Sequence, residues 1–173
     1  YGKTKKPTTE MLSEIDILIF DMQDIGVRYY TYLSTLTYIM EAAVENKIPL
    51  LILDRVNPLG REVRGPMLDL EFASFVGLHP IPVLHGMTMG ELAQMINGEG
   101  WLSNGIMADL KIIPFEGNIN QKVREKAFNP PPSPNMSNLE IAWLYQGLCL
   151  LEGTNLSEGR GSDLPFKLIG APW

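Results

Sequence analysis

Two short apolar runs with a helix-forming stretch between them constrain the fold of this chain more than any other feature. The first run, Ile15–Phe20, stops at an aspartate, and so does the second run, Ile48–Leu53. Between the runs, apolar residues recur at helical spacing from Tyr32 to Asn46. Nearly continuous apolar runs are typical of parallel strands, and a helix that joins two of them completes a βαβ unit. We therefore predict an α/β fold with a mainly parallel sheet.

Three more elements are predicted further along the chain. Thr88 and Glu91 have the spacing of a capping box, which predicts a helix from Thr88 to about Ile96. Leu110–Pro114 is a third candidate strand. Ser137 and Glu140 repeat the capping-box spacing after a proline-rich loop, and the helix that follows is predicted to bury Ile141, Leu144, Leu148 and Leu151 and to end at Gly153.

Composition excludes several classes of function. The 173 residues carry 14 Lys and Arg against 20 Asp and Glu, for a net charge of −6, which argues against a nucleic-acid partner or an anionic membrane surface. No apolar run approaches the length of about 18 residues that a membrane span needs. A single cysteine, Cys149, with two histidines predicts neither a disulfide nor a zinc site. No glycine-rich phosphate loop and no serine nucleophile motif is present, so the sequence supports neither a nucleotide cradle nor a serine nucleophile. We predict no metal and no cofactor.

Polar residues collect in three segments, each directly after an apolar element. These segments are residues 21–30, 54–58 and 152–161. Ligands of open parallel sheets bind at the carboxyl ends of the strands. If the first two strands are neighbours, the polar side chains that follow them share one rim, namely Asp24, Arg28, Arg55 and Asn57.

These residues favour a sugar ligand, although each also has a structural interpretation. Carboxylates, amides and arginines bind hydroxyl groups, and two opposed carboxyl groups are the usual machinery of glycoside hydrolysis. Aspartates at strand ends, however, often cap helices or stabilise turns, and an arginine beside acids often forms a plain ion pair. His85 and the tyrosines of the first segment also have a purely structural interpretation, in which they only pack.

Five strings of the sequence resemble one bacterial family, the NamZ-type exo-β-N-acetylmuramidases. These strings occur in the family's order and cover essentially the whole chain; they are Phe20–Tyr32, Leu53–Gly60, His85–Glu91, Pro132–Met136 and Leu151–Gly161. Two departures stand out: Val56 replaces a proline, and the segment Phe115–Pro130 lacks tryptophan-containing elements of the family. The second departure indicates either a shortened loop or an internal gap in the sequence.

The resemblance implies a Rossmann-like three-layer domain with a mainly parallel sheet. It also implies that residues 1–173 are the later part of that domain, and that a smaller C-terminal domain lies outside them. Members of the family are glycosidases that release N-acetylmuramic acid from the non-reducing ends of peptidoglycan fragments. The expected partner is therefore a peptidoglycan-derived sugar, and the expected location is secreted or periplasmic.

Candidate site residues follow from the same resemblance. Asp24 is the predicted catalytic carboxylate, acting with a glutamate of a family motif expected upstream of Tyr1, and Glu158 or Glu152 is held in reserve. Arg28 and Arg160 are our choices for the lactyl carboxylate, because an arginine can bind both of its oxygens. The full set of predicted substrate-binding residues is Gln23, Arg28, Tyr29, Arg55, Asn57, His85, Asn135, Asn155 and Arg160.

Two other functions remain open at this stage. A non-catalytic module that binds cell-wall sugars needs the same polar rim but no pair of opposed carboxylates. A nucleotide-sugar enzyme on a Rossmann-like fold is supported by fold analogy alone.

Overall fold

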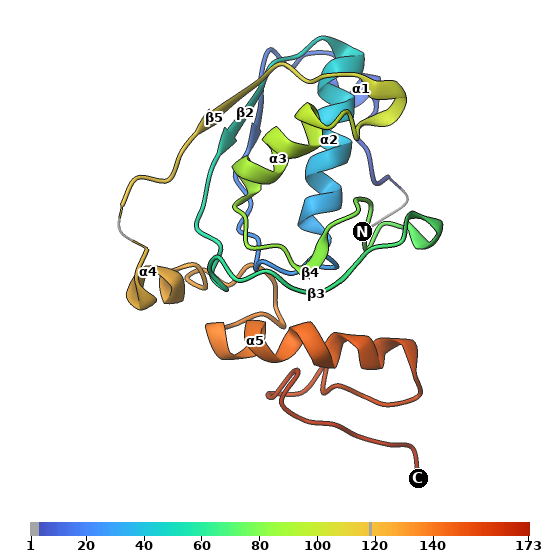
Figure 1. Ribbon diagram of the computed structural model, residues 1–173, viewed down its shortest axis with the longest axis vertical. Coiled ribbons are helices and arrows are strands. Elements are labelled where there is room, and N and C mark those ends of the chain that lie inside the picture. The colour runs from blue at the N-terminus through green and yellow to red at the C-terminus, as the bar shows by residue number, and fades with distance from the viewer. Residues whose placement is uncertain (1–3, 118) are drawn as a thin grey trace.

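The computed structural model describes residues 4–117 and 119–173, and the predicted βαβ unit lies at its centre (Figure 1). Strand β1 (Leu18–Phe20) is followed by helix α2 (Tyr32–Asn46) and strand β2 (Leu50–Leu53). Strand β5 (Leu110–Ile113) pairs with the other edge of β2. Both pairings are parallel and the strand order is β1-β2-β5. The α/β class and the parallel sheet are therefore confirmed.

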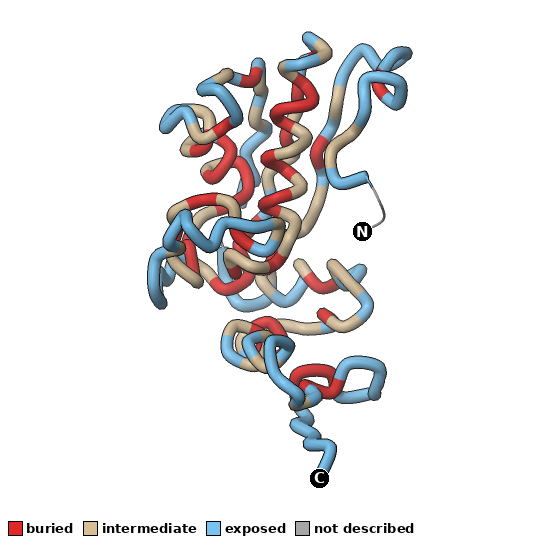
Figure 2. Tube along the Cα trace, turned by 90° about the vertical axis from the view of Figure 1, so that its right-hand side faces the viewer, coloured by how far each residue is buried: buried red, intermediate tan, exposed pale blue. Residues whose placement is uncertain are grey.

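Helices α2 and α3 (Met89–Gly98) pack together against one face of this sheet. Thr88 and Glu91 form the predicted capping box at the start of α3. The core between helices and strands contains Phe20, Leu36, Met40, Ile52 and Leu92, among others. Figure 2 shows buried positions running along the helices, whereas the C-terminal end of the chain is mostly exposed.

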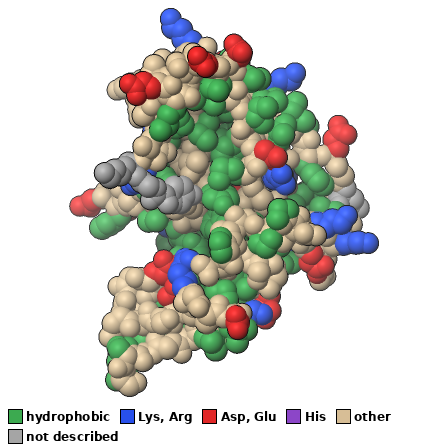
Figure 3. Space-filling model, turned by 180° about the vertical axis from the view of Figure 1, so that it is seen from behind, with side chains coloured by type: hydrophobic (Ala, Val, Ile, Leu, Met, Phe, Trp, Pro, Cys, Tyr) green, Lys and Arg blue, Asp and Glu red, His purple; other side chains and the backbone are tan. Residues whose placement is uncertain are grey.

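The opposite face of the sheet has a different character. Ile19 alternates with the buried Phe20, so it points away from α2 and is 58% exposed. Ile17 and Ile113 are also exposed. Figure 3 shows the molecule from behind, where hydrophobic side chains gather between the charged ones. Among the described residues, helices thus cover one face of the sheet.

Several elements of the structure were not predicted. Strands β3 (Arg64–Met67) and β4 (Pro82–Leu84) form an antiparallel pair inside a stretch that reads as irregular in the sequence. Glycine and proline within these strands weigh against a strand prediction. Short helices were missed as well, namely α1 (Thr9–Leu12), α4 (Gln121–Lys126) and the 3-10 turns η1 (Leu70–Phe72) and η2 (Ser103–Gly105).

Helix α5 (Leu139–Leu148) continues into the 3-10 turn η3 (Cys149–Gly153), and two details of its prediction were wrong. Asn138, not Ser137, is the N-cap, because its side chain accepts a hydrogen bond from the backbone N–H of Ile141. Leu144 is exposed and Tyr145 is buried in its place. The buried face of α5 packs on the segment that leads into α2, together with Phe166. In the described residues, no helix combines the length and apolar character that a membrane crossing requires.

Candidate active site

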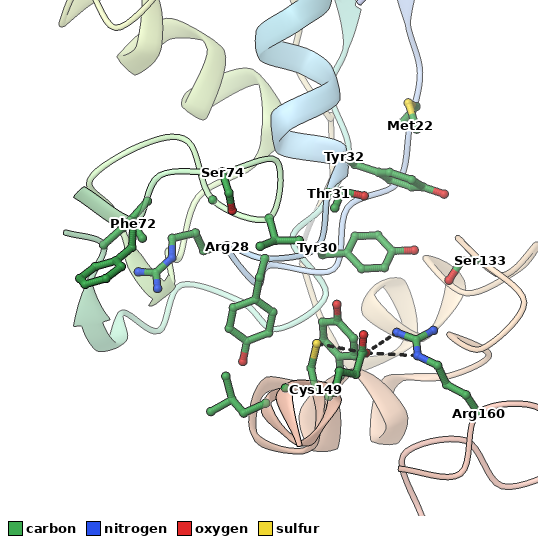
Figure 4. A pocket seen from close by; sticks show the side chains of 18 residues that line it. Met22, Arg28, Tyr30, Thr31, Tyr32, Phe72, Ser74, Ser133, Cys149 and Arg160 are labelled. Atoms are coloured by element: carbon green, nitrogen blue, oxygen red, sulfur yellow. Dashed lines mark hydrogen bonds and ion pairs between the residues drawn. The ribbon is translucent and has the colours of Figure 1, made fainter. Parts of the chain in front are cut away.

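An open cleft of about 940 Å³ lies between the segment that leads into α2 and the unit formed by α5 and η3 (Figure 4). Aromatic and aliphatic side chains make up most of its wall. Its charged lining residues are Arg28, Glu152 and Arg160. The other residues that matter below are Tyr29, Tyr30, Tyr32, Leu68, Phe72, Gly77, Ser133, Tyr145 and Cys149. The first and third polar segments of the sequence therefore meet at this cleft.

Glu152 and Arg160 form an ion pair on one side of the cleft. The Nη2 and Nε atoms of Arg160 donate hydrogen bonds to Oε1 of Glu152 at 2.5 and 3.2 Å. The Nε atom also lies 3.0 Å from Oε1 of Glu158, and the guanidinium sits over the ring of Phe166 at 4.9 Å. Burial acts against the charge, but the hydrogen bond to Glu152 raises the pKa of Arg160 overall. Arg160 thus pairs with two carboxylates, those of Glu152 and Glu158, and Glu158 is buried.

Arg28 lies on the other side of the cleft, beside Phe72 (Figure 4). Its Nη1 atom donates hydrogen bonds to the backbone carbonyls of Pro66 and Ile81, at 2.9 and 2.6 Å. Its backbone N–H is bound to the carbonyl of Val83 at 2.8 Å, which holds the start of the α2 segment against β4. Burial lowers the pKa of Arg28, because a half-buried cation loses part of its hydration.

Two tyrosines connect the cleft to the packed interior. The hydroxyl of Tyr29 donates to the backbone carbonyl of Gln146, so its ring is held against α5. Tyr30 also lines the cleft, yet its hydroxyl is buried. Burial raises the pKa of Tyr30, and the charge of Asp24 adds to that effect. Tyr30 therefore belongs to the wall of the cleft and is also influenced by the charge of the buried Asp24.

Asp24, Asn57 and His85 lie together, but inside the protein instead of on an open rim. Asp24 is only 5% exposed, and its Oδ2 atom accepts a hydrogen bond from the backbone N–H of Gly26 at 2.6 Å. The same atom is 3.5 Å from Nε2 of His85. Nδ1 of His85 accepts from the backbone N–H of Met87 at 3.3 Å, so its hydrogen is on Nε2 and faces Asp24. The rim predicted from the sequence is thus buried at Asp24 and Asn57.

The backbone turn at Gly26 explains why the cluster is buried. Gly26 has a φ of +90°, and a Cβ atom built there would lie 2.2 Å from Oδ1 of Asn57. Asn57 in turn bonds the backbone of Met87 and Leu59, at 3.0 and 2.9 Å. These contacts draw the segment inward. Within the described residues, three buried polar atoms nearby have no hydrogen-bond partner: Oδ1 of Asp24, the hydroxyl of Tyr30 and Nε2 of His85.

The remaining predicted residues lie away from the cleft. Gln23 donates to the carbonyls of Asp24 and Val56, at 2.6 and 2.9 Å, and so ties the end of β1 to the end of β2. Arg55 pairs with Asp21 at 2.6 Å on the surface, as the structural interpretation predicted. Asn135 is half-buried and Asn155 is exposed, and neither lines the cleft.

Asp54 also has the structural role that we weighed for it, since it caps α3. Its Oδ1 accepts from the backbone N–H of Gly90 at 2.8 Å, and its Oδ2 accepts from the hydroxyl of Thr88 at 2.7 Å. In the described part of the chain, no group of three or more His, Cys, Asp and Glu residues is arranged to hold a metal ion. Burial raises the pKa of the Cys149 thiol to about 11, so this cleft residue is protonated at neutral pH.

Sequence reasoning missed the aromatic part of the site. Tyr30, Tyr32 and Tyr145 line the cleft, although only Tyr29 of the tyrosines was predicted to bind substrate. The consecutive tyrosines of the first polar segment were the available signal. Tyr145 gave none, because the predicted buried face of its helix contained Leu144 and not Tyr145.

Two models of known protein families match this chain, one over its N-terminal part and one over its C-terminal part. The model described as exo-β-N-acetylmuramidase NamZ, N-terminal, matches residues 1–140. The chain belongs to the NamZ family. The corresponding C-terminal model matches residues 143–173, so the boundary between the two falls within α5, whereas we expected that domain to lie wholly outside the chain.

Individual relatives agree with the family assignment. The peptidoglycan β-N-acetylmuramidase NamZ of Bacillus subtilis is 52% identical over 177 aligned positions, which cover 100% of this chain and 42% of that protein. Because the alignment is only slightly longer than the chain, the segment Phe115–Pro130 is not much shorter than its counterpart in that relative.

Two solved structures share the fold. Both are crystal structures of DUF1343 family proteins from Bacteroides fragilis. The first has a TM-score of 0.88 and 45% identity, and the match covers 98% of this chain and 47% of that one. The second has a TM-score of 0.84 and 39% identity, and the match covers 100% and 46%. This NamZ-family chain therefore spans less than half the length of the relatives it matches.

Proposed function

We propose that the protein is a glycoside hydrolase that releases terminal β-linked N-acetylmuramic acid from peptidoglycan fragments. The observation that carries this proposal is the cleft, in which Glu152 and Arg28 face a wall of tyrosines. Aromatic faces cover the C–H surfaces of a sugar ring, and the charged groups bind its polar substituents. The family membership and the activity named for the Bacillus subtilis relative support the same function.

Glycoside hydrolysis needs two carboxyl groups on opposite sides of the scissile bond. Glu152 is the one carboxylate that lines the cleft among the described residues. Its pairing with Arg160 suits a base or nucleophile, because both roles need the charged form. The second group, the acid, has to protonate the leaving oxygen.

Asp24 is the proposed second carboxyl group. His85 and the Gly26 N–H face its Oδ2 atom, while Oδ1 is buried and has no hydrogen-bond partner among the described residues. Tyr30 lines the cleft and is close enough to Asp24 for the charge of Asp24 to raise its pKa, so Asp24 reaches a bound sugar only if the side chains around it move. Glu158, buried behind Arg160, is the reserve candidate.

The test uses the full-length protein and the chromogenic substrate 4-nitrophenyl β-N-acetylmuramide. Wild type is expected to release nitrophenol, and Glu152→Gln and Asp24→Asn are each expected to lower kcat by about 10²–10⁴-fold, the usual contribution of an acid or base. Glu140→Gln is the matched control, because this carboxylate of α5 is exposed and does not line the cleft. Activity within about threefold of wild type would remove the substituted residue from the chemistry.

Two other outcomes would replace the proposal. Binding of N-acetylmuramic acid without hydrolysis would indicate a module that only binds cell-wall sugars. Binding of nucleotides in place of muramic acid would indicate a nucleotide-sugar enzyme. We also propose that the protein acts outside the cytoplasmic membrane, where peptidoglycan lies, and cell fractionation with a specific antibody tests that location.

A further inference from the structure

The two arginines of the cleft differ in how their charges are compensated. Arg160 contacts two carboxylates, Glu152 and Glu158, and its guanidinium lies over an aromatic ring. Its hydrogen-bonding edge is therefore already used by the protein. Arg28 forms no ion pair with any described residue. Its known partners are backbone carbonyls.

The hydrogen bonds of Arg28 leave one edge of its guanidinium without a hydrogen-bond partner among the described residues. Both carbonyls, those of Pro66 and Ile81, bind Nη1. Nε and Nη2 have no partner among the described residues, and together they form a flat edge that matches the two oxygens of a carboxylate. The two carbonyls also fix the orientation of this edge before any ligand binds.

An uncompensated, half-buried cation costs stability, so its presence in a cleft points to an anionic ligand. Burial already lowers the pKa of Arg28, and none of its causes is a nearby carboxylate. A carboxylate from a ligand would restore the missing partner.

The surroundings of Arg28 also fit the small apolar part of a lactyl group. Gly77 has no side chain, and a Cβ atom built there would lie 3.7 Å from Nε of Arg28 and 3.4 Å from Cδ2 of Leu68. Arg28 and Leu68 thus both lie next to Gly77, and all three residues line the cleft. A lactyl group carries one carboxylate and one methyl group, which match Arg28 and Leu68 respectively.

We propose that Arg28 determines specificity by binding the lactyl carboxylate of N-acetylmuramic acid through its Nε and Nη2 atoms, with the lactyl methyl group on Leu68. Arg160 is a positioning residue for Glu152 and does not bind the ligand carboxylate. This inference rests on the proposed function. It gives different roles to Arg28 and Arg160, whereas the sequence analysis proposed both for the lactyl carboxylate.

Calorimetry on the full-length protein tests the inference with two ligands, N-acetylmuramic acid and its lactyl methyl ester. Wild type is expected to bind the acid at least about tenfold more tightly than the ester, since a hydrogen bond to a charged group contributes about that factor. Arg28→Lys keeps the positive charge but loses the two parallel N–H donors, so the preference for the acid over the ester is expected to fall to about threefold or less. Arg160→Lys, the matched control, is expected to keep the wild-type preference. An unchanged preference in Arg28→Lys, or none in wild type, overturns the inference.

A second variant keeps the test decisive if Arg28→Lys does not fold. Leu68→Ala leaves the hydrogen bonds of Arg28 intact. It is expected to weaken binding of N-acetylmuramic acid about fourfold, and to leave unchanged the binding of an analogue whose lactyl group lacks its methyl. Equal losses for both ligands contradict the assignment.

The assay with the nitrophenyl substrate separates this inference from the proposed function. If the wild type hydrolyses the nitrophenyl substrate and yet binds acid and ester equally, the glycosidase proposal holds and the proposed role of Arg28 is wrong. A preference for the acid without any hydrolysis means that Arg28 binds the anionic sugar in a protein that is not a glycosidase.

Discussion

His79 makes the stability of this protein depend on pH, and the size of this dependence can be calculated from its pKa in the folded protein. Its side chain is buried, stacks on Trp101 with ring centres 5.3 Å apart, and lies 2.8 Å from the hydroxyl of Thr37. That hydroxyl donates to the carbonyl of Leu33, so it accepts a hydrogen from Nε2 of a neutral His79. Burial lowers the pKa of His79 from 6.5 to about 4.

The sign and the size of the effect follow from this difference in pKa. As the pH falls below about 6.5, the unfolded chain takes up the proton and the folded protein does not, so stability is lost until the pH reaches about 4. One pKa unit corresponds to about 1.4 kcal/mol, so the full loss is about 3 kcal/mol. About 2 kcal/mol of it is expected between pH 7.5 and pH 5.

Urea unfolding of the full-length protein between pH 7.5 and pH 5 measures this loss. His79→Gln removes the titrating group, so the difference in unfolding free energy between wild type and variant should change by about 2 kcal/mol over that range. Thr37→Val is the control, because it removes the hydrogen bond and keeps the histidine. It should lower stability by about 1 kcal/mol with the wild-type pH dependence. Parallel curves for wild type and His79→Gln would refute the reasoning.

The regular parts of the fold could be predicted because local pattern and tertiary packing agree. The runs at Ile15–Phe20 and Ile48–Leu53 contain the parallel strands, and Thr88 with Glu91 marks the start of α3. Strands β3 and β4 could not be predicted in this way, because Pro66 and Pro82 suppress the signal. They form where tertiary contacts, such as the Arg28 side chain on the carbonyl of Pro66, hold the backbone.

The site was predicted in part, because residue spacing gives the strand end at which a side chain lies but not the direction in which it points. Arg28, Tyr29, Glu152 and Arg160 do line one cleft. Asp24 belongs to the same segment as Arg28, yet the left-handed backbone at Gly26 turns it inward. This inward direction of Asp24 depends on a contact of Gly26 with Asn57, which is distant in the sequence. No local sequence pattern reveals such a contact.

Two further predictions concern residues next to the site. Cys149 should react slowly with iodoacetamide at pH 7.5 and faster as the pH approaches 11, because burial raises the pKa of its thiol; rapid alkylation at pH 7.5 would contradict this. Gly26→Ala should destabilise the protein by more than about 1 kcal/mol in thermal unfolding, because the positive φ and the contact with Asn57 both oppose a side chain. Gly98→Ala, where a Cβ meets no atom within 4 Å, should be neutral or stabilising. Equal effects of the two substitutions would show that the turn at Gly26 does not hold Asp24 inward.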